Sequence, residues 1–395
     1  MSKKERRSVP VLRFKGFTDD WEQRKFGDFW KLKSGKAYKA SEYVNKGIPI
    51  INGETIKNGE IKSKNLNYLP KRYLLIKDNI ILKPDDVVIG LNRPIINNQL
   101  KISPIPKNIP VSFLYQRAGK IESKFSNLST IETYYLLERN IFNFSKITAI
   151  GSDQPFIKTS ALLSWKFFIP KEIEEKTINK LLAKISTLIF LQQRKLDRLL
   201  LLKKAYLTNL LPDKTQNPKV RFKEFNDKWK KLKLGNISSI SAGGDVNKQK
   251  LLKKGRYPVI ANALTNKGVI GYYESEYRIQ APAVTVTGRG DIGHAYARKT
   301  NFTPVVRLLS VKSKHNVDFL AEAINQKKVP FESTGVPQLT VPKLSNYKIL
   351  FPSSITEENK IGNFIIKFDE IINLQNKKIS SLEQVKNFLL QNMFI

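Results

Sequence analysis

Residues 12–21 read LRFKGFTDDW and residues 220–229 read VRFKEFNDKW, so one motif occurs twice at a constant offset of 208 positions. A lysine and a glycine follow each tryptophan at matching distances, as Lys25 and Gly27 and again as Lys233 and Gly235. Self-similarity at a fixed spacing is the sequence signature of a structural unit that is built more than once. The sequence therefore predicts two copies of one architecture in tandem.

A second set of matches closes each copy. Gln154-Pro155, Trp165-Lys166 and Ile169-Pro170 correspond to Pro337-Gln338, Tyr347-Lys348 and Phe351-Pro352. This set runs at an offset of 182, so the interiors of the two copies differ in length by 26 residues. One framework with two different interiors predicts a scaffold that presents two different readers.

A long heptad pattern follows each copy. Residues 178–210 place mainly apolar side chains at alternating spacings of four and three, and residues 361–393 repeat the pattern at an offset of 183. Both seams carry a glutamine and a lysine at equivalent places, Gln192 with Gln375 and Lys203 with Lys386. A polar residue in such a seam lowers stability but fixes register. We therefore expect two helices that pair with each other, rather than two helices that pack only on their own domains.

The first helix is expected to be long. Residues 174–209 number 36, which corresponds to roughly 54 Å at 1.5 Å per residue. Paired antiparallel, two such helices would hold two globular units apart about a pseudo-two-fold axis. Recognition of two half-sites one DNA turn apart needs a separation on this scale, about 34–36 Å.

The composition indicates a polyanionic partner. Lysine and arginine number 69 against 34 acidic residues, which gives a formal net charge of +35 and a pI near 10.0. Nucleic acid is the leading partner class and a membrane surface the second. There is no run of 18 apolar residues to span a membrane and no apolar signal core. The absence of cysteine excludes disulfides and thiolate–metal sites, and we expect a cytoplasmic protein.

The interiors read mainly as short strands and turns, with buried strands expected at residues 86–90 and 283–287 and local helices at 129–139 and 317–326. The predicted fold class is α+β, with two mainly-β recognition domains, each followed by a long helix, the helices pairing as an antiparallel coiled coil. The predicted division is residues 1–170 and 213–352 for the domains and residues 171–212 and 353–395 for the helices.

Across nearly its whole length the chain resembles the specificity subunit of type I restriction-modification enzymes. The resemblance rests on the paired opening motifs that end in Trp21 and Trp229, and on the closing motifs GSDQP at 151–155 and GVPQL at 335–339. The Ile169-Pro170 and Phe351-Pro352 steps before acidic helix starts match as well. The first domain departs from the family at residues 90–94, where a second glycine-containing turn is often found.

The resemblance implies that each domain reads one half of a bipartite double-stranded DNA target. It also implies that the helices dock two methyltransferase subunits, which methylate adenine, and that motor-nuclease subunits complete the complex and cleave unmodified DNA. The chain itself would be non-catalytic and would hold no cofactor. S-adenosylmethionine, ATP and Mg²⁺ would be bound by the partner subunits.

Three patterns imitate other sites. Residues 288–293 match G-x-G-x-x-G, but no helix or acidic residue follows at the spacing of a dinucleotide site, so we expect a strand-turn-strand. Asp85 with Glu122 and Lys124 imitates a nuclease metal site at long spacing. His294 and His315 have no ligand cluster beside them, and we expect them to contact solvent or phosphate.

Base reading needs amide and guanidinium groups on rigid turns. In the first domain the predicted base contacts are Asn92, Arg93, Ser152 and Gln154, with Lys36, Tyr38 and Lys39 as phosphate or stacking contacts. In the second domain they are Asn262, Thr265, Asn266, Arg289, Thr334 and Gln338, with Lys248 and Lys267 on the DNA backbone. Each of these polar residues is also a common former of solvated turns.

Two other classes of function remain open at this stage. One is a standalone DNA-binding regulator with two basic modules, which would bind its target without partners. The other is a nuclease that uses Asp85, Glu122 and Lys124. The sequence reveals neither which bases are read nor the spacing between the half-sites.

Overall fold

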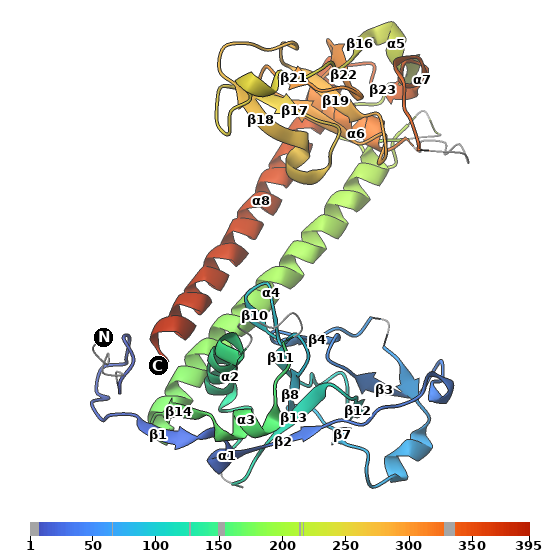
Figure 1. The fold of residues 1–395 in the computed structure, drawn as a ribbon. Helices are drawn as coiled ribbons and strands as arrows, with labels where there is room; N and C mark the ends of the chain where they lie inside the picture. Colours follow the sequence, from blue (N-terminus) through green and yellow to red (C-terminus); the bar gives the residue numbers. More distant parts are fainter. Residues whose placement is uncertain are drawn as a thin grey trace. The chain divides into compact units, whose positions relative to one another are not determined.

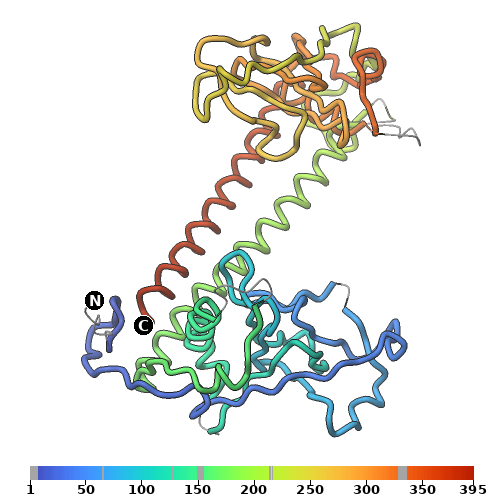
Figure 2. Tube along the Cα trace, viewed as in Figure 1, coloured from blue at the N-terminus to red at the C-terminus, as the bar shows by residue number. Residues whose placement is uncertain are grey.

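The computed structural model of the chain describes residues 8–64, 66–125, 128–148, 155–212, 215, 217–327 and 336–395 (Figure 1). The chain divides into two compact units. Figure 2 colours the chain by residue number, so that each unit can be traced along the sequence. Unit 1 consists of Met1–Leu191 with Ser380–Ile395, and unit 2 consists of Gln192–Ile379. Each unit therefore contains one copy of the repeat and a part of both long helices.

Unit 1 is built on two four-stranded sheets. The main sheet has the order β11-β8-β13-β2 and consists of Ile102–Pro104, Val87–Gly90, Ala118–Ser123 and Trp30–Ser34. The second sheet has the order β6-β3-β12-β7 and consists of Tyr68–Leu69, Ile48–Ile51, Ser112–Leu114 and Ile81–Leu82. Strand β8 is buried along its whole length, as its run of apolar residues predicts.

Short elements complete unit 1. Strand pairs are formed by β1 Glu22–Lys25 with β14 Lys166–Ile169, β4 Ile56–Lys57 with β5 Glu60–Ile61, and β9 Ile95–Ile96 with β10 Gln99–Leu100. The helices are α1 Phe26–Phe29, α2 Tyr134–Thr148 and α3 Thr159–Ser164, with 3-10 turns at Ala40–Glu42 and Lys71–Leu75. The helix predicted at 129–139 was misplaced, because residues 129–133 form turns and the buried apolar face begins at Tyr134.

Unit 2 repeats this plan with fewer strands. Its main sheet has the order β16-β22-β19-β20 and consists of Ser238–Ala242, Leu308–Ser313, Ala283–Thr287 and Ala295–Arg298. Its second sheet, β18-β17-β21, consists of Val269–Tyr273, Tyr257–Ile260 and Thr303–Pro304. Strand β19 coincides with the strand predicted at 283–287.

The remaining elements of unit 2 also have counterparts in unit 1. Strands β15 Lys230–Lys233 and β23 Lys348–Phe351 pair antiparallel, as β1 and β14 do. The helices are α5 Leu234–Ile237, α6 Val317–Asn325 and α7 Val341–Ser345, with 3-10 turns at Lys248–Lys250 and Thr265–Gly268. Asn316 caps α6, since its side-chain oxygen accepts the N–H groups of Asp318 and Phe319.

The two long helices are α4 Glu172–Leu210 and α8 Ile355–Asn392. Within unit 2 they run antiparallel, because Gln192 meets Gln375 while Tyr206 meets Phe364. The Gln375 amide donates to the side-chain oxygen of Gln192 at 3.0 Å, so the two predicted seam glutamines bind each other. The predicted pairing of the helices is therefore confirmed.

The two seam lysines are not equivalent in the structure. Lys203 lies in unit 2 and its ammonium group contacts the carboxylate of Asp369 at 2.6 Å. Lys386 lies in unit 1 over the ring of Tyr135, at 5.4 Å from the ring centre. In unit 1 the helices share a core, since Ile178 and Leu182 of α4 pack in the same cluster as Leu390 of α8.

The duplicated opening motif fastens each copy to the first turn of its helix. Arg13 makes two hydrogen bonds to the buried carboxylate of Glu174, at 2.7 and 2.8 Å, and the indole of Trp21 donates to the same group. Arg221, Glu357 and Trp229 repeat this arrangement with the same two distances. The need to satisfy one buried carboxylate thus explains why the arginine and the tryptophan recur at a fixed separation.

Candidate nucleic-acid interface

A tight turn after β19 presents the side chain of Arg289 in unit 2. Gly288 precedes Arg289, and a Cβ atom at Gly288 would come within 2.3 Å of the Arg307 carbonyl oxygen. Gly290 follows with φ 73°, a conformation that favours glycine. The glycines therefore allow the backbone to pack closely while the Arg289 side chain remains exposed.

A second segment holds this turn from one side. The N–H of Leu339 donates to the Gly288 carbonyl at 2.9 Å, and the N–H of Gly290 donates to the Pro337 carbonyl at 3.2 Å. Arg289 and Gln338 are therefore opposite each other in an antiparallel bridge. Two residues that the sequence placed in separate motifs form one small surface.

A third predicted residue holds the turn from another side. The side-chain oxygen of Asn262 accepts the N–H of Gly288 at 2.6 Å and that of Arg289 at 3.2 Å. Its side-chain amide donates to the Arg289 carbonyl at 2.6 Å. Because both ends of the amide bind this backbone, Asn262 positions Arg289. The reading of a base by Asn262 itself stays a prediction.

Unit 1 builds the same arrangement at residues 91–93. The N–H of Ile157 donates to the Leu91 carbonyl at 2.9 Å, and the N–H of Arg93 donates to the Pro155 carbonyl at 2.8 Å. Asn92 thus takes the place of Arg289, and the exposed Arg93, at φ 42°, takes the place of Gly290. The departure noted at residues 90–94 therefore changes the side chains without changing the backbone pairing.

A buried lysine supports the turn of unit 1. The ammonium group of Lys101, which is 5% exposed, donates to the carbonyl of Asn92. Burial lowers the pKa of Lys101 below its ordinary value, and the nearby charge of Lys57 acts in the same direction. Lys101 therefore fixes the backbone of Asn92 from within the domain.

The structure shifts one predicted match by a residue. Asn92 bridges to Phe156, whereas Arg289 bridges to Gln338, so Phe156 and not Pro155 is the counterpart of Gln338. Phe156 is 51% exposed beside the 91–93 turn. Applying the offset of 182 to every residue of the closing motif would have paired Phe156 with Gln338, since the same offset pairs Pro155 with Pro337.

Two arginines beside these turns were missed by the sequence analysis. Arg117 and Arg307 precede equivalent strands, β13 and β22, and both are exposed with positive φ angles of 67° and 71°. The Arg117 carbonyl accepts the N–H of Leu91 at 2.9 Å, so this backbone adjoins the presented turn. An alignment of the two strands would have paired these arginines.

The predicted contacts Thr265, Asn266 and Lys267 lie together on one exposed turn of unit 2. Asn266 and Lys267 have φ angles of 48° and 51°, and the guanidinium of Arg298 donates to the Lys267 carbonyl at 2.7 Å. Burial lowers the pKa of Arg298 to about 10. The turn is therefore anchored to strand β20 by the partly buried guanidinium of Arg298.

The predicted phosphate contacts divide into two groups. Lys36, Lys39, Lys248 and Lys267 are all exposed. Tyr38 is buried in a cluster with Ile50, Leu69 and Phe113, and its hydroxyl donates to Asn79 at 3.2 Å. Burial raises the pKa of Tyr38 to about 12. A ring in this position does not fit the predicted stacking on nucleic acid.

The predicted contacts Ser152, Gln154 and Thr334 lie outside the described residues.

The structure also resolves the patterns that imitate other sites. Residues 288–293 join β19 to the antiparallel strand β20, which confirms the predicted strand-turn-strand. Glu122 forms ion pairs with Lys33 at 2.6 Å and Lys120 at 3.3 Å, while Lys124 donates to the Gly27 carbonyl. Among the described residues, no group of three or more His, Asp or Glu side chains could hold a metal ion.

Comparison with known families gives two matches within the chain. Residues 18–201 and 226–384 both match the family described as the type I restriction modification DNA specificity domain. The matches together cover most of the sequence and fall on the two copies of the repeat.

Curated relatives carry related names. The chain is 31% identical over 206 residues to the MjaVIII specificity subunit of Methanocaldococcus jannaschii, which covers 52% of this chain and 48% of that protein. It is 26% identical over 170 residues to the EcoAI specificity subunit of Escherichia coli, which covers 43% of this chain and 29% of that protein. The chain thus matches about half or less of the length of these relatives.

Solved structures show the same fold. An S subunit of a type I restriction-modification system from M. genitalium superposes with a TM-score of 0.62 at 14% identity, covering 98% of this chain and 99% of that one. A chain from a structural study of type I complex assembly superposes with a TM-score of 0.56 at 14% identity, covering 95% and 97%. The α+β fold with two recognition domains and paired long helices is therefore that of these S subunits.

Proposed function

The chain belongs to the type I restriction modification DNA specificity family, and we propose that each of its two units reads one half of a bipartite DNA target. The observation that carries the proposal is the presented turn. Both units build it with the same backbone pairing, but Asn92 and Phe156 stand in unit 1 where Arg289 and Gln338 stand in unit 2. Two turns with the same backbone pairing but different side chains are suited to reading two different half-site sequences.

The chemistry of these side chains suggests which bases they read. An arginine matches the two acceptors of guanine in the major groove, and an asparagine or glutamine matches the donor and acceptor of adenine. We therefore assign Arg289 to guanine and Asn92 to adenine. Arg117 and Arg307 flank the turns and, with the exposed lysines, would bind phosphates.

The long helices supply a surface for protein partners. Large apolar side chains on α4 and α8 are 39–69% exposed, namely Leu188, Phe190, Leu191, Val385 and Phe388 in unit 1 and Leu200, Leu201, Leu202, Ile371 and Leu374 in unit 2. Exposed apolar side chains in such number are typical of a surface that a protein covers. We propose that each set docks one methyltransferase subunit and that the pairing of the helices sets the distance between the half-sites.

The remaining activities are assigned to partners. In this proposal, methyltransferase subunits bind S-adenosylmethionine and methylate adenine, and motor-nuclease subunits use ATP and Mg²⁺ to cleave unmodified DNA. The chain supplies sequence selection and no catalysis of its own. In the described part of the chain, none of the helices is long and apolar enough to cross a membrane.

Sequencing of adenine methylation in cells with and without this gene, in the presence of its methyltransferase, tests the proposal. The expected result is one bipartite motif that is methylated only when the gene is present. Tight, specific DNA binding by the chain without any change in methylation would instead support the standalone regulator.

A further inference from the structure

The two units differ at one buried carboxylate. Glu175 in α4 and Glu358 in α8 are equivalent, since each follows the glutamate that binds the opening arginine. Glu175 is 4% exposed and Glu358 is 1% exposed. A carboxylate this deeply buried needs a partner if it is to carry charge.

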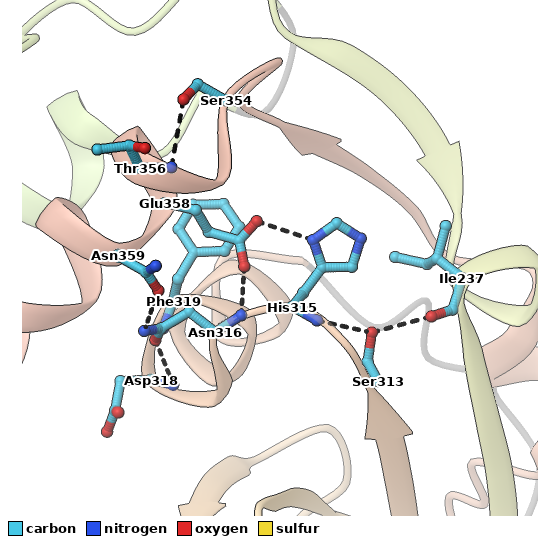
Figure 3. Close-up of polar contacts among 10 residues, drawn as sticks. All are labelled: Ile237, Ser313, His315, Asn316, Asp318, Phe319, Ser354, Thr356, Glu358 and Asn359. Carbon is cyan, nitrogen blue, oxygen red and sulfur yellow. Dashed lines mark hydrogen bonds and ion pairs between the residues drawn. The ribbon is translucent and has the colours of Figure 1, made fainter.

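In unit 2 the partner is supplied by the chain itself. The Nδ1 atom of His315 lies 2.8 Å from Glu358, and the backbone N–H of Asn316 donates to the other carboxylate oxygen (Figure 3). The imidazole lies against the ring of Phe351 with a centroid distance of 4.3 Å. The flat imidazole ring of His315 therefore packs on Phe351 and places a nitrogen within hydrogen-bond distance of the Glu358 carboxylate.

In unit 1 one carboxylate oxygen of the equivalent residue, Oε1 of Glu175, has no donor among the described residues. Phe125 stands in the place of His315, because its N–H binds Ser123 at 3.0 Å as the N–H of His315 binds Ser313 at 3.3 Å. The ring of Phe125 packs instead on Phe29 at 5.9 Å. Among the described residues, nothing donates a hydrogen bond to Oε1 of Glu175.

An open cavity of about 360 Å³ adjoins Glu175. Its wall combines the rings of Phe29 and Phe125 with the apolar side chain of Ile169, which is the counterpart of Phe351. Three further carboxylates line it, and each already has a partner: Asp20 accepts from Ser8, Glu22 pairs with Arg24, and Glu172 pairs with Lys176. Lys171, also in the wall, pairs with Asp19.

We propose that this cavity binds the guanidinium group of an arginine side chain from a partner protein. A guanidinium is planar, carries several donors and stacks on aromatic rings, so it supplies what His315 supplies in unit 2. An acidic cavity on a chain of net charge +35 selects for a cation. The half-exposed Phe125 and the exposed Ile173 nearby offer a protein partner apolar contact. The assignment goes beyond the proposed function, because it concerns unit 1 alone and requires no DNA.

Saturation-transfer NMR of the full chain with N-acetyl-arginine methylamide tests the proposal, with the neutral citrulline analogue as a matched control. The expected result is a signal from the arginine compound and none from the citrulline compound. At about pH 9, where the wild-type Glu175 carboxyl is ionised, Glu175→Gln removes the charged acceptor and should weaken binding about tenfold or more. Phe125→His should abolish binding, because it reproduces the closed arrangement of unit 2, and its thermal unfolding shows whether the variant is folded.

Three results would overturn the proposal. Equal signals from the two compounds, or an unchanged signal in Glu175→Gln, would show that Glu175 does not bind the cation. No signal at about 20 mM of the arginine compound would show that the cavity does not take this group. Binding seen only in a chain that starts at Ser8 would assign the cavity to the chain's own first residues. Since these measurements contain no DNA, failure of the proposed DNA recognition would leave them unaffected.

Discussion

Arg289 and Gln338 are opposite each other in an antiparallel backbone bridge, held there by hydrogen bonds on both sides of the pair. Asn92 and Phe156 occupy the same positions in unit 1. Each unit thus joins the end of one central strand to the closing motif of its own copy. The divergent interiors differ in which side chains this junction presents, which is the basis of the predictions that follow.

The first prediction concerns Asn262. Its replacement by alanine removes three hydrogen bonds from the backbone of residues 288–289, so Arg289 should lose its fixed position. We expect DNA affinity to fall about tenfold, since about 1.4 kcal/mol suffices for that factor. Gel-shift titration of Asn262→Ala measures it, with Asn346→Ala as a control that removes a single exposed hydrogen bond elsewhere in unit 2. Equal losses in the two variants would contradict a positioning role.

The second prediction concerns salt. With exposed lysines and arginines on both units, DNA affinity should fall by roughly 10³ or more between about 50 and 200 mM salt if six or more phosphates are contacted. Fluorescence anisotropy over this range gives the slope of log affinity against log salt. A slope shallower than about −3 would exclude an extended phosphate footprint.

The third prediction concerns the opening motif. Glu357→Gln leaves Arg221 and Trp229 without the carboxylate that both of them bind. The loss of charged hydrogen bonds should destabilise unit 2 by about 2–3 kcal/mol. Urea unfolding followed through Trp229, the tryptophan of unit 2, measures the change. Glu276→Gln breaks the exposed pair with Lys250 in the same unit and should cost less than about 1 kcal/mol. A comparable loss in both variants would contradict the argument.

The fourth prediction concerns pH. Burial, with the nearby charges of Glu172 and Glu132 acting in the same direction, raises the pKa of Glu175 from 4.5 to about 8. Because the folded state holds this proton more tightly than the unfolded state, stability should fall as pH rises from about 4.5 to 8. Glu175→Gln removes this loss, so its melting temperature should exceed that of the wild type by a margin that grows over the same range. A margin that does not change with pH would show that Glu175 ionises normally.

The sequence predicts what depends on periodicity and repetition. The helix expected at 174–209 is α4, Glu172–Leu210, and the two seam glutamines bind each other because a heptad pattern defines its own partner face. The strand at 283–287 was predicted from its run of small and β-branched residues, and every side chain in β19 is buried, as such a run indicates. These features are local, or are repeated in the chain.

The sequence could not predict contacts that join distant segments. Asn262 reads as a turn residue, and only the fold brings its amide to the backbone of Arg289. His315 was expected to contact solvent or phosphate, but the start of α8 places Glu358 beside it. Tyr38 follows two exposed residues and yet turns into the core, because the second sheet covers it.

The most direct test of the central claim is methylome sequencing of Asn92→Ala and Arg289→Ala, expressed separately with the methyltransferase. If each unit reads its own half-site, Asn92→Ala should relax the sequence of one half only, and Arg289→Ala should relax the other half only. A loss of about 1–3 kcal/mol of discrimination at a single base pair is expected for each. Relaxation of the same half by both variants, or of both halves by either one, would show that the two units do not read independently.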